Sequence, residues 1–227
     1  MINLFVGFDP REEVGSHVFN SSVLAHTTEP VTICHLHKPA LENKLGFLFD
    51  AGSNDFTVTR FLIPHLMNRR NEWAIFVDGA DMVCQGDLAE LYALRDPTKA
   101  VMVVKHDYQT KAARKYIGTK MEAPNTHYER KNWASAMLIN CGHYSWPDAE
   151  TIARTPKIDL LQFKFLPDER IGELPVEWNW LADEMGPNDD AKLLHWTQGI
   201  PGFNHYANAP HAATWQAYHA KANYATP

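Results

Sequence analysis

The sequence predicts an α/β protein in which helices flank a mostly parallel central sheet. Two observations support this prediction: uninterrupted apolar runs, and an opening with the order strand, helix, strand. Apolar runs such as residues 73–77 and 100–104 are typical of strands that are buried on both faces, as in parallel sheets. A strand–helix–strand opening is one βαβ unit, whose two strands lie parallel in the same sheet.

The first βαβ unit can be placed from its helix start. Asp9 and Pro10 are residue types favoured at the N-cap and at the first helical position, and two acids follow in the first turn. The next segment carries Pro, Gly, Asn and Ser between apolar patches, which is typical of a loop. The expected elements are therefore a strand at residues 2–8, a helix from Asp9 to about His26, a strand at 31–36 and a loop at 37–54.

The later elements follow from helical spacing and caps. Residues 58–69 have helical spacing, with Pro64 expected to kink the helix. Asp87 with Glu90 resembles a capping box at the start of a short helix. The other expected elements are a strand at 134–140, a helix at 148–154, an edge strand or extended arm at 174–180, a strand at 191–196 and a helix at 212–221.

One long segment, residues 107–131, is polar, basic and without apolar periodicity. A segment of this kind inside a compact domain is typical of a flexible loop or a lid. We find neither an internal repeat nor a linker, so we expect residues 1–227 to form a single domain.

Composition excludes several classes of protein. A net charge of −6 gives no sign of a surface for nucleic acid or anionic membranes, and no run approaches the ~18 apolar residues of a membrane span. Residues 1–9 lack the basic start of a signal peptide. The three cysteines, Cys34, Cys84 and Cys141, lack metal-ligand spacing, which indicates reduced thiols and a cytoplasmic protein.

Asp78 and Asp81 follow directly after the apolar run at 73–77, separated by Gly79 and Ala80. Ligands of open α/β sheets bind beyond the carboxyl ends of the strands, where two carboxylates can hold a divalent cation and, through it, a diphosphate. The alternative is that these acids only cap the amides of a turn. The sequence has no Walker loop, Gly-x-Gly-x-x-Gly, Cys-x-x-Cys, His-Glu-x-x-His or Gly-x-Ser-x-Gly motif.

Residues 76–91, Phe-Val-Asp-Gly-Ala-Asp-Met-Val-Cys-Gln-Gly-Asp-Leu-Ala-Glu-Leu, resemble the Asp-x-Asp segment of family 8 glycosyltransferases, which is followed by Gly-Asp-Ile/Leu and a helix. Four further segments resemble that family in the same order: residues 57–64, 136–140, 166–179 and 194–201. The resemblance covers roughly residues 2–205. It is strongest to small bacterial and phage members with Lys-Asn-Trp and Glu-Trp-Asn-Trp motifs, here at 131–133 and 177–180.

This resemblance implies a GT-A-like (Rossmann-like) domain and a metal-dependent enzyme. The enzyme would move a sugar from a nucleotide donor, UDP in this family, with retention of anomeric configuration. The implied metal ligands are Asp78, Asp81 and His195, a set that suits Mn²⁺ better than Mg²⁺ because one ligand is nitrogen. The acceptor is expected to be a saccharide or a glycolipid, since the negative net charge argues against DNA as the acceptor.

The resemblance also implies a donor site and two candidate catalytic residues. The guanidinium of Arg60 suits a phosphate, and an acid at the position of Asp168 contacts the donor sugar in the resembled family. The expected donor-binding residues are Val6, Gly7, Phe8, Asp9, Arg60, Asp78, Gly79, Lys105, Asn140 and Gly199.

Two departures from the family pattern bear on activity. One extra residue separates the two acids, which makes Asp81 the stronger metal candidate and leaves Asp78 as an alternative contact for the donor ribose or sugar. The late Lys-Pro-Trp is replaced by Ile200-Pro201-Gly202-Phe203, so the lysine that would meet the diphosphate is missing. The alternatives left open are a non-catalytic sugar-nucleotide-binding domain and a metal-dependent nucleotidyltransferase or hydrolase.

Overall fold

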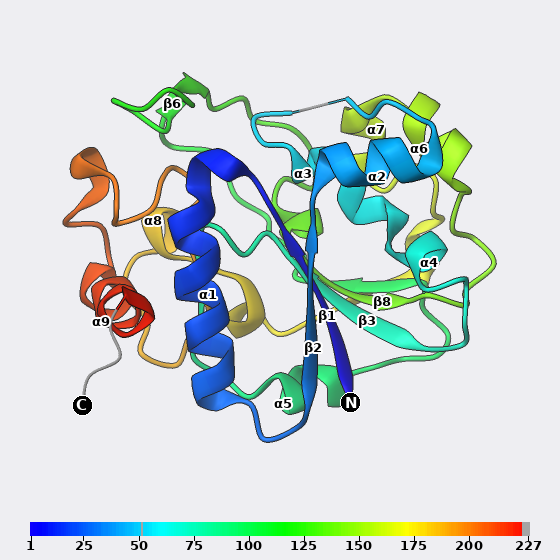
Figure 1. Cartoon of the computed structure of the whole chain (residues 1–227), viewed down its shortest axis with the longest axis horizontal. Coiled ribbons are helices and arrows are strands. Elements are labelled where there is room, and N and C mark those ends of the chain that lie inside the picture. Colours follow the sequence, from blue (N-terminus) through cyan, green and yellow to red (C-terminus); the bar gives the residue numbers. More distant parts are fainter. Residues whose placement is uncertain (51, 224–227) are drawn as a thin grey trace.

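The computed structural model describes residues 1–50 and 52–223 and has a six-stranded central sheet flanked by helices (Figure 1). The strand order is β2-β1-β3-β8-β5-β9. The strands are β1 (Ile2–Gly7), β2 (Val31–Leu36), β3 (Trp73–Val77), β5 (Val101–Val103), β8 (Ala136–Asn140) and β9 (Ile171–Glu173).

The sheet is mostly parallel, as predicted. β1 pairs in parallel with β2 and with β3, and β5 pairs in parallel with β9. β8 lies antiparallel between β3 and β5, so it is the one reversed strand of this sheet. The start of β8 therefore lies beside the ends of β3 and β5, at the edge that we call the carboxyl edge of the sheet.

Both faces of the sheet are covered. One face packs a large apolar cluster against α2 (Lys38–Leu45), α3 (Phe56–Thr59), η2 (Arg60–Leu62), α4 (Ile63–Leu66), α6 (Ala149–Arg154) and α7 (Lys157–Leu161). The other face packs against α1 (Glu13–His26), β4 (Met82–Cys84) and α5 (Leu88–Ala93). Alternate residues of β3 serve the two clusters: Ala74 and Phe76 face the first, Ile75 and Val77 the second.

A smaller layer is built on the outer side of α1. α9 (Ala212–Asn223) lies against α1, as Figure 1 shows on the left of the view, and a third apolar cluster joins them around Trp196 and Trp215. The other strands of the described residues form two short sheets. One consists of β10 (Trp180–Leu181), β11 (Leu193–His195) and β4, and the other of β6 (Arg114–Lys115) paired with β7 (Ala123–Pro124). The short helices are η1 (Pro10–Glu12), η3 (Trp133–Ser135), η4 (Asp168–Arg170), η5 (Val176–Asn179), α8 (Ala182–Met185) and η6 (Asn204–Tyr206).

Several helix starts are confirmed by their caps. The side chain of Asp9 accepts a hydrogen bond from the Arg11 N–H at 2.9 Å. Asp87 and Asp148 cap α5 and α6 in the same way, accepting from the amides of Ala89 (2.9 Å) and Thr151 (2.8 Å). The capping box is only half formed, because the carboxylate of Glu90 pairs with Lys192 instead.

Two element predictions were wrong, and a third was borne out in part. Residues 37–54 are not all loop, since α2 begins at a Pro-containing first turn and ends at Gly46, whose φ of 74° suits a glycine cap. Residues 174–180 form η5 and the start of β10 rather than one extended strand. Segment 58–69 is helical up to Leu66, as predicted, but it is divided into α3, η2 and α4, with Pro64 in the first turn of α4. In the part of the chain that the structure describes, no helix combines the length and apolarity that a bilayer span requires.

Candidate metal centre and adjoining cavity

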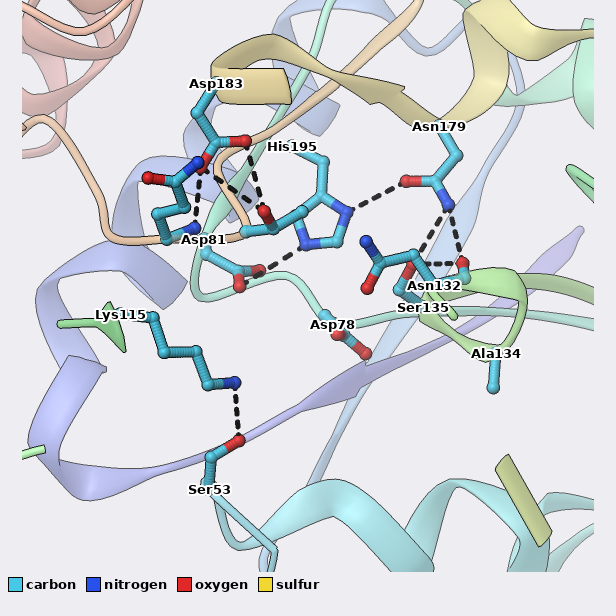
Figure 2. A network of polar contacts seen from close by, with 12 residues as sticks. Ser53, Asp78, Asp81, Lys115, Asn132, Ala134, Ser135, Asn179, Asp183 and His195 are labelled. Atoms are coloured by element: carbon cyan, nitrogen blue, oxygen red, sulfur yellow. Dashed lines mark hydrogen bonds and ion pairs between the residues drawn. The ribbon is translucent and has the colours of Figure 1, made fainter. Parts of the chain in front are cut away.

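Three predicted metal ligands meet at the carboxyl edge of the sheet (Figure 2). Asp78 follows β3, Asp81 precedes β4 and His195 ends β11. β4 and β11 are antiparallel with His195 opposite Met82, so Asp81 and His195 are neighbours across two strands. One ligand atom of each residue lies within 4.8 Å of the others, and all three side chains are buried.

The turn between the acids accommodates the extra residue. Gly79 has a φ of 77°, a conformation that favours glycine, and the Ala80 amide donates to the carbonyl oxygen of Asp78 at 2.9 Å. The two carboxylates therefore face one point although Gly79 and Ala80 separate them. Gly79 itself packs on Val6, where an added Cβ would lie 2.3 Å from Cγ1. Gly79 was predicted to contact the donor. In the structure it shapes this turn and is not among the residues that line the larger cavity.

A chain of hydrogen bonds orients the His195 ring. The amide nitrogen of Asn179 donates to the Asn132 carbonyl oxygen (3.0 Å) and to Ser135 Oγ (2.9 Å), so its oxygen must be the atom that lies 3.0 Å from His195 Nδ1. Nδ1 therefore carries a proton and donates it to Asn179. The other nitrogen, Nε2, lies 3.5 Å from Asp81 Oδ2, on the side of the two carboxylates. Orienting contacts of this kind are typical of metal-binding histidines.

The charges around His195 favour its protonated form in the absence of a cation. Burial alone lowers the pKa of His195, but the carboxylates of Asp81, Asp78 and Asp183 raise it above its ordinary value overall. A proton on Nε2 would thus compensate the two acids. A divalent cation at the same place would compensate them better, and its binding would require that proton to leave.

We expect Asn179→Ala to weaken Mn²⁺ binding by about 10- to 100-fold, the usual effect of removing the group that orients a histidine ligand. The matched control is Asn179→Asp, because both variants lose the amide's donated hydrogen bonds but only aspartate still accepts from Nδ1–H. Calorimetric titration with Mn²⁺ measures the difference. Equal affinity in the alanine variant and the wild type would show that Asn179 does not orient a metal ligand.

Arg60 fixes the second acid. Its guanidinium lies 2.6 Å from Asp78 Oδ1, donates to the Ala134 carbonyl oxygen at 2.7 Å, and stands over the ring of Phe76 at 5.0 Å. Both partners are buried. Burial raises the pKa of Asp78 to about 6, although Arg60 acts in the opposite direction. The predicted phosphate-binding arginine is thus at the site, and in the structure it orients Asp78.

A cavity of about 660 Å³ adjoins the metal centre and is lined by Asp78, Arg60, Lys115 and Thr197 together with parts of segments 52–57, 123–135 and 157–161. A second cavity of about 300 Å³ is lined by residues 105–109 and 127–131 and by Trp133, and the predicted Lys105 is among them. The two cavities share His127, Tyr128 and Lys131.

The predicted donor contacts in the first strand do not line the larger cavity. Val6 and Gly7 are buried in the sheet, and Gly7 is covered by the ring of Phe56, which an added Cβ would approach to 2.6 Å. Phe8 lies between two histidine rings. Asp9 is fully buried. Its carboxylate accepts hydrogen bonds from the amide and guanidinium of Arg11 and from the amide of Asp55.

Three other predicted residues are also not among those that line the larger cavity. Asn140 ends the reversed strand β8, where it pairs with Trp73, so it lies at the opposite edge, about 16 Å from Asp78 at ~3.3 Å per residue. Asp168 precedes β9, and its side chain is 81% exposed and paired with Arg130 at 2.7 Å. Gly199 packs under the ring of Tyr206.

Sequence reasoning missed several residues of the site. Asp183 of α8 accepts hydrogen bonds from the Gln198 amide (2.6 Å) and Thr197 Oγ1 (3.2 Å), which holds the chain that follows His195. Ser135 ends η3, directly before β8, and could have been placed at the site only by knowing the direction of that strand. Lys115 comes from a segment without periodicity, where only the local excess of basic residues marked it.

Comparisons with known proteins agree on one family. The model of glycosyl transferase family 8 matches residues 15–206. "Protein CDI" of Arabidopsis thaliana is 36% identical over 227 residues, which covers 93% of this chain and 83% of that protein.

Solved structures share the fold. The galactosyltransferase LgtC, solved with donor and acceptor sugar analogues, has a TM-score of 0.67 at 12% identity and covers 99% of this chain and 98% of its own. GlyE of Streptococcus pneumoniae has a TM-score of 0.59 at 13% identity, and the bifunctional WbbM has 0.53 at 16%. This chain spans 60% of the GlyE chain and about half, 51%, of the WbbM chain, while 96% of it is covered in each. By its match to the family model over residues 15–206 and its identity to the Arabidopsis protein, the chain belongs to glycosyl transferase family 8 and is a glycosyltransferase.

Proposed function

We propose that this glycosyltransferase is metal-dependent and moves a sugar from a UDP-sugar donor to a saccharide or glycolipid acceptor, with retention of anomeric configuration. The observation that supports this most is the convergence of Asp78, Asp81 and His195 beside a cavity of about 660 Å³. A cavity of this volume is in the range that small ligands and cofactors occupy.

The residues fit a divalent cation. Asp81 Oδ1 is buried and has no hydrogen-bond partner within the described residues, a costly arrangement unless a cation completes it. Two carboxylates and one imidazole suit Mn²⁺, while Mg²⁺ suits the nitrogen less. Bound there, the cation would supply positive charge for the departing diphosphate.

The chain's own residues hold this centre in place. Asn179 orients the His195 ring, and Arg60 orients the carboxylate of Asp78. Because retention can follow from acceptor attack on the face that the diphosphate leaves, we assign no protein nucleophile. Asp168 and Asn140 have no part in the proposal, since both lie away from the metal centre.

We place the acceptor in the second cavity, because it shares His127, Tyr128 and Lys131 with the first. LgtC was solved in complex with both donor and acceptor sugar analogues, which supports two adjoining sites in this fold. We further propose that segment 107–131 is a lid, since it lines both cavities and would exclude water from the donor. The free thiols of Cys34, Cys84 and Cys141 suit the cytoplasm that we propose as its location.

A donor screen tests the proposal. The purified chain is incubated with a panel of UDP-, GDP- and ADP-sugars, with Mn²⁺ or with a chelator, and nucleotide release is measured. We expect slow release of UDP from at least one UDP-sugar, only with Mn²⁺. Release that persists in the chelator would contradict metal dependence. Binding of UDP-sugars with no release from any would instead support the non-catalytic sugar-nucleotide-binding alternative.

A further inference from the structure

The cavity beside the metal centre has an excess of positive charge. Its charged lining residues, among those described, include the cations Arg60, Lys115 and Lys131 and a single carboxylate, Asp78. That carboxylate is already paired with Arg60. Lys131 is buried, and among the described residues it donates only to neutral oxygens: Asn125 Oδ1 at 2.6 Å, the Thr126 carbonyl oxygen at 2.9 Å and Thr110 Oγ1 at 3.1 Å. A buried cation without an anion is unfavourable, so the cavity is suited to a ligand with several negative charges.

Lys115 points into this cavity from the lid segment. Figure 2 shows its side chain on the Asp81 and Asp78 side, with Nζ directed to Ser53. Nζ donates to Ser53 Oγ at 2.7 Å, and no carboxylate of the described residues forms an ion pair with it. Burial lowers the pKa of Lys115, whereas the more distant charges of Asp81 and Asp78 act to raise it. Its one polar partner is neutral and can be exchanged for an anionic oxygen.

The backbone beside Lys115 is fixed to the chain that follows His195. The amide of Tyr116 donates to the Gln198 carbonyl oxygen at 2.6 Å, and that of Ile117 donates to the Tyr206 hydroxyl at 3.0 Å. The Tyr116 side chain is fully buried. Lys115 is therefore held in position by packed neighbours, and little ordering is needed when a ligand enters.

The segment that follows β11 has no lysine at the position where the family pattern places one to meet the diphosphate. Ile200 occupies the position at which the family resemblance leads one to expect lysine, and its side chain is fully buried in the apolar cluster with Trp196 and Trp215. The position is thus part of the packing between β11 and α9, and the positive charge at the site has to come from another segment.

We propose that Lys115 binds the diphosphate of the nucleotide donor. The lid segment, residues 107–131, would then supply the lysine that is missing at position 200. This inference rests on the proposed function, because it names a further contact within the same donor site. An ammonium group is a compact donor for phosphate oxygens, and hydrogen bonds between charged partners are stronger than those between neutral ones. Donor binding and closure of the lid segment would then be linked through this one side chain.

The test compares Lys115→Met with Lys120→Met, an exposed lysine of the same segment. Binding of UDP, GDP, ADP and uridine is measured by calorimetry in Mn²⁺, with uridine measured by competition. We expect Lys115→Met to bind UDP about 10- to 100-fold more weakly, with uridine unchanged. Lys120→Met should match the wild type. The melting temperature of Lys115→Met should equal or exceed that of the wild type, because a half-buried cation that forms no ion pair with the described residues is removed.

The outcomes separate the two proposals. Wild-type binding of UDP with equal binding by Lys115→Met would overturn the role of Lys115 and leave the donor site intact. A wild type that binds none of the three diphosphates would overturn the proposed function and this inference together. A lowered melting temperature, with uridine weakened as much as UDP, would assign Lys115 to folding and overturn the inference. Recovery of UDP binding by Lys115→Arg would support it.

Discussion

Asp81→Asn is expected to reduce sugar transfer at least about 1,000-fold, since one charged ligand of the metal centre is removed and with it several kcal/mol of transition-state stabilisation. The fold should survive the change. Asp81 Oδ1 has no hydrogen-bond partner in the described structure, and its other oxygen lies 3.5 Å from His195 Nε2. Neutralising this buried acid removes a desolvation penalty but also removes a charge that favours protonated His195. The two effects oppose each other, so the melting temperature without metal should change little.

The measurement is donor turnover with saturating Mn²⁺, together with thermal unfolding in chelator. Asp189→Asn, at an exposed aspartate, is the matched control and should retain full activity. Activity within threefold of wild type for Asp81→Asn would remove Asp81 from the metal centre. Loss of activity together with a large fall in melting temperature would point to a structural role for Asp81.

Gly15→Ala is expected to damage both stability and the metal centre. A Cβ on Gly15 of α1 would lie 1.8 Å from the carbonyl oxygen of Ala80, so the backbone of the Asp78–Asp81 turn would have to move. Helix propensity favours alanine by up to about 1 kcal/mol, but overpacking against backbone costs about 1–3 kcal/mol or more, and the steric effect should dominate. The net loss should lower the melting temperature by about 2–8 °C.

A measurement of Mn²⁺ affinity separates a local effect of this clash on the turn from a general loss of stability. Mn²⁺ affinity should fall at least tenfold in Gly15→Ala at a temperature where the variant is fully folded, because the turn carries both acidic ligands. Val14→Ala, on the exposed side of α1, is the control and should change neither quantity appreciably. A Gly15→Ala protein with wild-type melting temperature and Mn²⁺ affinity would mean that α1 does not support the turn.

Strands and caps could be predicted because their signals are local. The apolar runs at 73–77 and 100–104 became β3 and β5, and the Asp residues at positions 9, 87 and 148 cap the helices that the sequence led us to expect. The helix α2 was missed because its Pro start and Gly cap are also the residues of a loop.

Strand direction decided which residues reach the site, and direction has no local signal. The family resemblance led us to expect Asn140 in the donor site, yet β8 is reversed and carries Asn140 to the opposite edge. For the same reason the residues that precede β8, Asn132 and Ser135, arrive at the metal centre and position Asn179. The role of Lys115 likewise depends on contacts of Tyr116 and Ile117 with the C-terminal part of the chain, more than 80 residues away.

The clustering of Asp78, Asp81 and His195 could be predicted because a family pattern added what spacing alone left open. Asp78 and Asp81 alone were equally consistent with a capped turn. The turn at Gly79 shows why one extra residue between the acids is tolerated, since its backbone conformation returns both carboxylates to one point.

A crystal structure with Mn²⁺ and UDP, recorded with anomalous scattering from manganese, tests the metal centre most directly. We expect one anomalous peak per chain, bound by Asp78, Asp81 and His195 Nε2 at about 2.0–2.3 Å, with the UDP diphosphate completing the coordination. An anomalous peak elsewhere, or UDP bound in the cavity with no manganese between the two acids and His195, would contradict the proposed metal-dependent transfer.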